Sequence, residues 1–329
     1  MAEVVALGEL LIDFATQSMD ADGYPTMVAH PGGAPANFLA ALAKFGTETA
    51  LIGKVGNDTF GNLLINTLKK AGIATQGIVV AEDVFTTLAF VTFDETGDRS
   101  FAFARKPGAD TRIRFEEVDL RLIEEAKVFH FGTLSLTDEP ARSATCRCVA
   151  YAKEHGKLIT YDPNLRKPLW RDLSVAKEQL LWGLQQADVV KISDEEVDFL
   201  FGMKPEEGAR HILSHFGVKL VFVTCGANGC YFKNANAEGH VPGISGISVI
   251  DTTGAGDIFG GSALWKLLEV GKTPKELTGE ELTEIVGFAC VSAGLSTTKP
   301  GGISSVPEIE DIISGGRQSY AEFNSGHIA

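Results

Sequence analysis

The chain has 329 residues, of which 44% are hydrophobic and 22% are charged. This composition excludes a disordered or fibrous protein, and the length fits one large domain or two unequal ones. The chain contains 29 basic and 43 acidic residues, which give a net charge of −14. A nucleic-acid partner is not expected, because phosphate backbones are held mainly by Lys and Arg, but one small phosphate ligand remains compatible with this charge.

No feature of the sequence indicates export, membrane insertion or a zinc site. The five cysteines are odd in number and form no C-x-x-C pair, which favours buried free thiols. Residues 1–12 lack a basic segment and contain Glu3 and Glu9, so they predict a strand and not a signal peptide. No apolar run reaches the roughly 18 residues of a membrane helix. We therefore expect a cytoplasmic protein without a membrane partner.

The amino-terminal third of the chain contains signals for two kinds of β structure. Val4–Leu7 is an apolar run that predicts a buried strand, which continues through Phe14. Residues 86–104 alternate around a turn at 95–98, which predicts a β-hairpin. Together with residues 13–29, this hairpin is expected to form a small antiparallel sheet outside the main body. Further local signals predict a helix at 35–45, a strand at 49–52 and a helix that Asp58 caps and that runs to Lys70.

Strands and helices alternate in the rest of the chain. This alternation predicts an α/β fold with a mostly parallel sheet and helices on both faces. Ligands of such folds bind beyond the carboxyl ends of the strands. The predicted strands are 128–131, 158–161, 189–192 and 220–224, with a short β-type run at 247–250, and the predicted helices are 115–125, 139–155, 175–186, 195–201, 205–215, 255–269 and 280–295.

The segment Asp251-Thr252-Thr253-Gly254-Ala255-Gly256-Asp257 carries the strongest chemical signal. Its small residues at 254–256 let a ligand approach unpaired N–H groups at a helix start, which is an anion hole. Asp257 would repel an anion there, but it fits a base that takes a proton from an attacking hydroxyl during phosphoryl transfer. The helix N-terminus is expected to keep Asp257 ionised and only modestly basic. A helix-capping Asp after a glycine turn would explain Asp257 alone, but not the whole segment.

A second segment, Gly32-Gly33-Ala34-Pro35-Ala36-Asn37, combines close backbone approach with an amide in the first turn of a helix. An Asn there can donate to and accept from a sugar hydroxyl, and Asp13 could accept hydroxyl protons beside it. An ordinary glycine turn and an Asp at a strand end are the alternative interpretations of these residues.

Together, the two glycine segments resemble the signatures of the ribokinase-like (PfkB) carbohydrate kinases, and the resemblance runs from Val4 to Pro307. It implies a Rossmann-like α/β body with a small β-sheet lid. The body would comprise residues 1–12, 34–84 and 112–314, the lid 13–33 and 85–111, and a tail 315–329. The resemblance also implies that Asp257 is the catalytic base, that Gly254, Ala255 and Gly256 form the anion hole, and that Asp13, Gly32, Gly33 and Asn37 bind the sugar.

Three further segments, 7–14, 103–110 and 161–170, resemble the fructokinases of this family. This similarity implies that Arg166 lies near the transferred phosphate and that Asn164 belongs to the sugar site. It also implies that Arg105 reaches the sugar or the product phosphate from the lid. A planar guanidinium suits phosphate oxygens, although a surface ion pair is the alternative for each arginine.

The nucleotide and metal sites are also implied by the resemblance. Lys191, Ser193 and Glu196 match a segment that orders magnesium and phosphate, with Glu196 acting through water, although Ser193 and Glu196 also fit a capping box. Asp251 and Thr253 match the surroundings of a monovalent cation in relatives. The segments that match the ATP site contain Thr224, Gly226, Gly229 and Cys290.

The sequence therefore predicts an ATP-dependent sugar kinase that uses Mg²⁺ and K⁺, and a homodimer through the lid is compatible with the resemblance. Within this family the resemblance implies a fructokinase that yields fructose 6-phosphate. A 2-keto-3-deoxygluconate kinase or a ribokinase would use the same frame, and a non-catalytic sugar or nucleotide sensor is the alternative from another class. A dehydrogenase is more distant, because no G-x-G-x-x-G follows the first strand.

Overall fold

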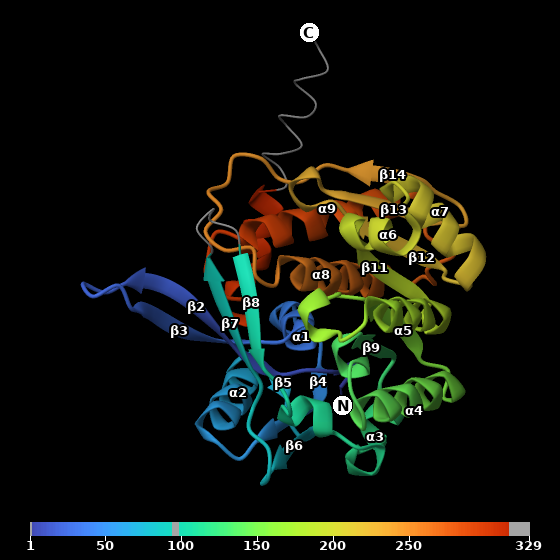
Figure 1. Ribbon diagram of the computed structural model, residues 1–329. Helices are drawn as coiled ribbons and strands as arrows, with labels where there is room; N and C mark the ends of the chain where they lie inside the picture. Colours follow the sequence, from blue (N-terminus) through green and yellow to red (C-terminus); the bar gives the residue numbers. More distant parts are fainter. Residues whose placement is uncertain (1, 94–98, 316–329) are drawn as a thin grey trace.

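A computed structural model describes residues 2–93 and 99–315 and contains two separate sheets (Figure 1). The main sheet has ten strands in the order β14-β13-β12-β11-β10-β9-β1-β4-β5, with β6 also paired to β4. Its strands are parallel except for β13 and β14 at one edge. The strands are β1 (Val4–Leu7), β4 (Thr49–Gly56), β5 (Ile73–Ala74), β6 (Ile78–Ala81), β9 (Val128–Gly132), β10 (Leu158–Asp162), β11 (Val189–Ser193), β12 (Leu220–Thr224), β13 (Cys230–Asn234) and β14 (Glu238–Val241).

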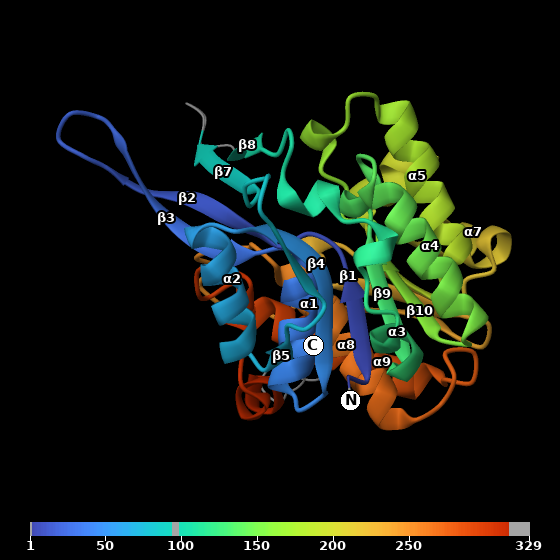
Figure 2. The same cartoon turned by 90° about the horizontal axis from the view of Figure 1, so that it is seen from below.

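Helices cover both faces of the main sheet, as predicted (Figure 2). Side chains alternate along a strand, so Val4 and Ala6 of β1 enter one buried cluster while Val5 and Leu7 enter the other. The first cluster includes α1 (Ala34–Lys44), α2 (Thr59–Lys70), α8 (Ala255–Val270) and α9 (Gly279–Ser296), and the second includes α3 (Arg121–Glu125), α4 (Ala141–Glu154), α5 (Leu173–Gln186), α6 (Asp194–Phe201) and α7 (Pro205–Phe216).

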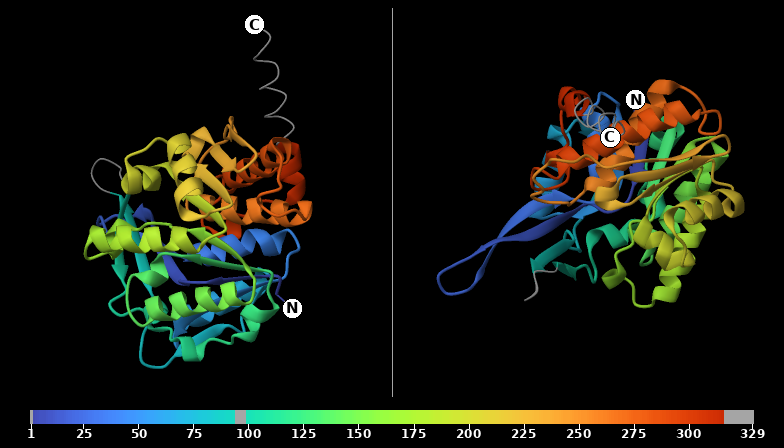
Figure 3. Two further views of the ribbon diagram at one scale, coloured as in Figure 1. Left: turned by 90° about the vertical axis from the view of Figure 1, so that its right-hand side faces the viewer. Right: turned by 90° about the horizontal axis from the view of Figure 1, so that it is seen from above.

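The small sheet projects from the body and has the order β3-β2-β7-β8 (Figure 3). It consists of β2 (Leu11–Met19), β3 (Pro25–Gly32), β7 (Leu88–Phe93) and β8 (Arg99–Ala104). The predicted hairpin at 86–104 is confirmed, but its turn at 95–98 lies outside the described residues. The prediction of a purely antiparallel sheet is wrong, because β2 and β7 pair in parallel. Both strands leave the body in the same direction, so each pairs antiparallel only with the strand that returns to the body.

Helix ends follow local capping signals. Asp58 accepts a hydrogen bond from the Gly61 N–H at 2.8 Å and begins α2, as predicted. The helix predicted at 115–125 is instead a short 3₁₀ turn at Phe115–Glu117 followed by α3. The Asp119 carboxylate accepts from the N–H of Arg121, the first residue of α3, at 3.2 Å, so a local side-chain bond lies where a continuous helix was predicted.

The β-type run predicted at 247–250 is not a strand. The N–H groups of Ile250 and Asp251 donate to the Thr297 carbonyl at 2.8 and 3.0 Å, so this segment is tied to the end of α9 and not to a strand. Val249 and Ile250 are 57% and 64% exposed. Hydrophobic character alone therefore did not make this segment a strand. The predicted tail, 315–329, lies outside the described residues except for Gly315.

Candidate active site

A cavity of about 230 Å³ lies at the carboxyl ends of the parallel strands, between the main sheet and the small sheet. This is where an α/β sheet of this kind places its ligand. We call it the first cavity. Its walls come from the small sheet, α1, the loop after β10 and the start of α8, and its lining residues are Glu9, Leu11, Asp13, Gly33, Ala34, Asn37, Val91, Phe103, Leu134, Asn164, Arg166, Thr252, Thr253, Gly254 and Asp257.

Asp257 lies in the first turn of α8 and is only 7% exposed. Its two carboxylate oxygens accept from the amide groups of Asn37, at 2.9 Å, and Asn164, at 3.2 Å. Asn164 has a φ of 48° and is the one non-glycine residue with positive φ in the described part of the chain. Such strained backbone is concentrated at functional sites, and here it aims an amide at Asp257.

Burial raises the pKa of Asp257, although Lys191, the Asn37 amide and Arg166 all oppose this shift. We expected the helix N-terminus to keep this carboxyl ionised and only modestly basic. The pKa of this carboxyl is raised and not lowered, so its basicity is greater than expected, because removal of water from the carboxylate outweighs the nearby favourable groups. A carboxylate with a raised pKa accepts a proton more readily, which suits a general base.

Three predicted glycines lie in close contacts at the first cavity, and at two of them, Gly254 and Gly33, the nearest atom belongs to the backbone. Gly254, which caps α8, has a left-handed φ of 77°, and a Cβ on it would lie 2.9 Å from the Gly302 Cα. A Cβ on Gly33 would lie 2.4 Å from the Glu9 carbonyl oxygen. A Cβ on Gly32 would lie 2.5 Å from a carboxylate oxygen of Asp13. Side chains at these positions would therefore displace the cavity walls.

Asp13 and Arg166 carry opposite charges in the first cavity. Burial raises the pKa of Asp13 to about 6, while the positive charge of Arg166 opposes the shift. Arg166 is exposed, and none of the described residues accepts a hydrogen bond from its guanidinium. Its charge is therefore available to an anionic ligand at the cavity mouth.

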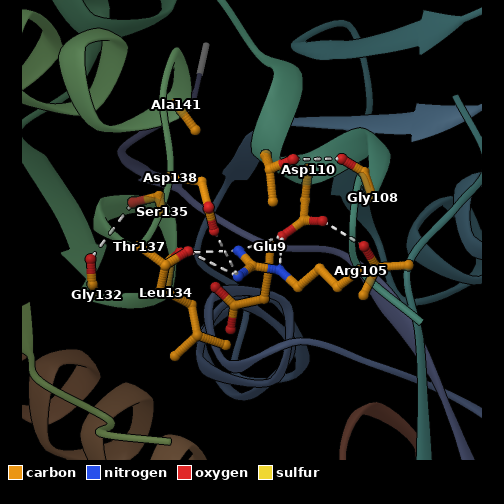
Figure 4. Close-up of polar contacts among 12 residues, drawn as sticks. Glu9, Arg105, Gly108, Asp110, Gly132, Leu134, Ser135, Thr137, Asp138 and Ala141 are labelled. Carbon is orange, nitrogen blue, oxygen red and sulfur yellow. Dashed lines mark hydrogen bonds and ion pairs between the residues drawn. The ribbon is translucent and has the colours of Figure 1, made fainter. Parts of the chain in front are cut away.

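Arg105 is not brought into the first cavity. Its side chain is buried, and its Nε donates to the Asp110 carboxylate at 2.8 Å (Figure 4). Its other nitrogens donate to the Leu134 carbonyl at 2.8 Å and to the Thr137 hydroxyl at 2.7 Å. The ion-pair alternative describes this geometry, except that the pair is buried and not at the surface. The arginine thus supports the wall that contains Leu134.

Glu9 is a site residue that the sequence did not single out. It lines the first cavity beside Arg105 (Figure 4) and accepts from the Ala34 N–H, at the start of α1, at 2.9 Å. Burial raises its pKa to about 7. The sequence does contain a signal for Glu9, because this glutamate interrupts an otherwise apolar run. A carboxylate that is buried in such a run needs a polar partner.

A second cavity, of about 500 Å³, lies on the other side of the segment that begins α8. Thr252 lines both cavities, so they meet at the predicted anion hole. The first N–H groups of α8 lack intrahelical acceptors and are available there. The second cavity brings together Thr224, Gly226, Gly229 and Cys290, as predicted, with Ala227, Gly243, Ile244, Gly246, Ile247, Val249, Thr252, Ala255, Gly256, Phe259, Ala293, Gly294 and Thr297.

Lys191, Ser193 and Glu196 line neither cavity. The Ser193 hydroxyl accepts from the Glu196 N–H at 3.2 Å, and a Glu196 oxygen accepts from the Ser193 N–H at 2.9 Å, which is a capping box. The other Glu196 oxygen accepts from the Leu165 N–H at 2.6 Å. Glu196 therefore fixes the loop that carries Asn164.

Asp251 ties the start of the glycine segment to residue 301. One of its oxygens accepts from the Thr253 N–H at 2.9 Å and from the Thr253 hydroxyl at 2.7 Å, and the other accepts from the Gly301 N–H at 2.9 Å.

Within residues 2–93 and 99–315, no three or more His, Cys, Asp or Glu side chains gather to hold a metal ion. Among the described helices, none is long and apolar enough to span a membrane.

Known proteins share this whole architecture. The chain is 40% identical over 310 residues to probable fructokinase-2 of Arabidopsis thaliana, with 92% of each chain covered. An ATP-bound fructokinase structure from Xylella fastidiosa has a TM-score of 0.88 and 30% identity, covering 97% of this chain and 99% of its own. A fructokinase double mutant from Vibrio cholerae O395, with fructose, ADP and potassium bound, has a TM-score of 0.83 and 30% identity, with coverage of 95% and 98%. Residues 1–309 match the pfkB family carbohydrate kinase, and the chain therefore belongs to that family.

Proposed function

We propose that the chain is an ATP-dependent fructokinase, which transfers the γ-phosphoryl group of ATP to the 6-hydroxyl of D-fructose. The observation that carries this proposal is the position of Asp257, a buried carboxylate at the start of the helix where two cavities meet. The first cavity would hold the sugar and the second the nucleotide. Fructose is favoured by the names of the relatives at about 40% identity.

In the proposed reaction, the oxygen of the fructose 6-hydroxyl attacks the γ-phosphorus of ATP, and Asp257 accepts the proton of that hydroxyl. The bond from phosphorus to the bridging oxygen breaks, and the products are fructose 6-phosphate and ADP. The N–H groups at Gly254–Gly256 and the guanidinium of Arg166 stabilise the charge on the transferring group. Asn37 and Asn164 hold the Asp257 carboxylate in place, since each donates to one of its oxygens.

The proposed ion requirements are Mg²⁺ and K⁺. Mg²⁺ bound with ATP would neutralise phosphate charge, and Glu196 would contribute to holding it through water. The two oxygens of Glu196 accept the N–H groups of Leu165 and Ser193. K⁺ would be held by oxygens near Asp251 and Thr253, where Asp251 connects this segment to Gly301. The potassium ion in the Vibrio cholerae structure supports this part of the proposal.

We also propose that the small sheet is a lid. Leu11, Val91 and Phe103 of this sheet line the first cavity, so its approach would exclude water that competes with the sugar as acceptor. A homodimer through this sheet is part of the proposal, since Met19 and Tyr24 near its far end are 64% and 68% exposed. A cytoplasmic location is also part of it.

The position of Arg105 favours a neutral sugar over 2-keto-3-deoxygluconate. A sugar acid needs a cation for its carboxylate, and an Arg105 that reached the sugar from the lid, as the resemblance implies, would supply one. Its guanidinium is instead occupied by Asp110, Leu134 and Thr137. Arg166 is then assigned to the phosphoryl group, and the described residues that line the first cavity include no second arginine or lysine for an acidic sugar. A ribokinase remains the alternative that this feature does not separate from a fructokinase.

The test is the Asp257→Asn variant in an assay of ADP release. With MgATP, we expect fructose to be preferred over ribose, 2-keto-3-deoxygluconate, tagatose and glucose, and K⁺ to increase the rate. Asp257→Asn should lower kcat by about 10²–10⁴-fold, because it removes a general base, while calorimetry shows fructose binding nearly unchanged. Asp83→Asn is a matched control on an exposed side chain.

Near-normal turnover in Asp257→Asn would exclude this residue as the base. Preference for another sugar would retain the kinase but exclude the fructose assignment. If the wild type binds ATP but turns over none of the sugars, the sensor alternative would replace the enzyme.

A further inference from the structure

We propose that Lys191 is a positioning residue whose ammonium group, held by Asp162 beneath the first turn of α8, supplies the positive charge behind Asp257 and the anion hole. This inference rests on the proposed function, because it takes Asp257 as the general base. Lys191 itself lines neither of the two cavities.

The geometry places the ammonium directly against the catalytic helix. Lys191 lies on β11 and Asp162 ends the neighbouring parallel strand β10, so both side chains extend from the same end of the sheet. Lys191 Nζ lies 2.9 Å from an Asp162 oxygen. A Cβ built on Gly256 would lie 2.9 Å from the same Nζ. The ammonium therefore packs against the residue that precedes Asp257.

This ion pair is enclosed by protein. The side chains of Lys191 and Asp162 are 13% and 7% exposed, so solvent screens their charges weakly. The second oxygen of Asp162 is buried and has no hydrogen-bond partner among the described residues. A buried pair of this kind adds little net stability compared with apolar side chains, which points to a role in the chemistry of the site.

Lys191 is the principal cation that favours the ionised form of Asp257. Its charge is the largest of the influences that oppose the effect of burial on the Asp257 pKa. The carboxylates around Lys191 raise its own pKa, so it stays protonated. The charged groups that face Asp257 are Lys191 on β11, Glu196 on α6, Asp162 at the end of β10, Arg166 in the loop after β10, and Asp13 on β2.

The two members of the pair should therefore affect the pH profile in opposite directions. Loss of the ammonium raises the pKa of Asp257 further, so the acidic limb of the kcat profile should move to higher pH. Loss of the Asp162 charge leaves the ammonium less neutralised beside Asp257, so the acidic limb should move to lower pH. A purely structural role for the pair gives no reason for shifts of opposite sign.

The experiment compares Lys191→Met, Asp162→Asn and Lys191→Arg in the fructose assay from pH 5 to 9. Lys191→Met should lower kcat at neutral pH by roughly 10–100-fold, with KM for fructose and ATP nearly unchanged. Lys191→Arg keeps the positive charge, so it should retain most of the wild-type kcat and leave the acidic limb of the kcat profile at its wild-type pH. Lys219→Met is the matched control, because Lys219 forms a 2.6 Å pair with Asp188 at the amino-terminal ends of β12 and β11, away from Asp257.

Shifts of the same sign in both variants would overturn the inference. So would a rise in KM for ATP alone, which would indicate direct nucleotide contact. If Lys191→Met does not fold in thermal melts, the direction of the Asp162→Asn shift decides. Failure of the proposed function is separate, since it would appear as a wild type that does not phosphorylate fructose.

Discussion

At the scale of single residues, Glu9 illustrates how burial sets the protonation of a carboxyl group. Its pKa rises from 4.5 to about 7, so between these values the unfolded chain is ionised while the native state keeps a proton. Its contribution to stability is therefore complete below pH 4.5 and is lost as the pH rises through 7. The shift corresponds to a loss of at most about 3 kcal/mol in the free energy of unfolding.

Glu9→Gln should remove this loss, because an amide does not ionise and still accepts from the Ala34 N–H. We expect urea denaturation to show a more stable variant at pH 8 and little difference from the wild type at pH 4.5. Burial also raises the pKa of Asp13, to about 6, and it raises the pKa of Asp162 against the opposing charge of Lys191, so part of the decline should remain. Glu178→Gln on the exposed side of α5 is the control. An unchanged slope of stability against pH would contradict the assignment.

At the scale of elements, the junction between the end of β3 and α1 depends on one glycine. Gly33 caps α1 with a φ of 120°, and a Cβ there would meet the Glu9 carbonyl oxygen at 2.4 Å. Gly33→Ala should therefore destabilise the protein and raise KM for fructose, because α1 carries Asn37. Gly46→Ala is the matched control, since its φ is 93° but no atom lies within 4 Å of the built Cβ.

The control should lose about 1–2 kcal/mol from backbone strain alone, and Gly33→Ala at least twice as much, as measured by urea denaturation. Equal losses would show that the contact with Glu9 relaxes easily, and an unchanged KM would separate this junction from the sugar site.

Elements were predictable from the sequence where their signals are local. Asp58 and the Ser193–Glu196 box cap helices through bonds within a few residues. The parallel pairing of β2 with β7, and the loop at 247–250, depend on which strand edges come within reach, which no local signal specifies. The position of Asp257 followed from the D-T-T-G-A-G-D segment. The burial of Glu9 and Arg105 could not be predicted from any one segment, because their partners come from several separate segments.

At the scale of the whole molecule, the Asp110 carboxylate joins the small sheet to the body. Thr87 precedes β7 and Arg105 follows β8, and both side chains donate to Asp110. Arg105 continues this connection to Thr137 and Leu134 on the body. One carboxylate therefore holds both ends of the β7–β8 hairpin at a fixed position relative to the first cavity.

Asp110→Asn should loosen this connection, because it removes the charge partner of a buried arginine. Removal of one partner of a buried ion pair lowers stability by about 3–5 kcal/mol. If the small sheet excludes water, as proposed, the variant should also raise KM for fructose and increase ATP hydrolysis relative to fructose phosphorylation. Both rates are measured by ADP release, with and without fructose.

Asp138→Asn is the matched control, because Asp138 lies 4.0 Å from the same arginine but its side chain is 43% exposed. A destabilised Asp110→Asn variant with an unchanged ratio of hydrolysis to phosphorylation would show that the joint supports the fold without controlling access of water to the site.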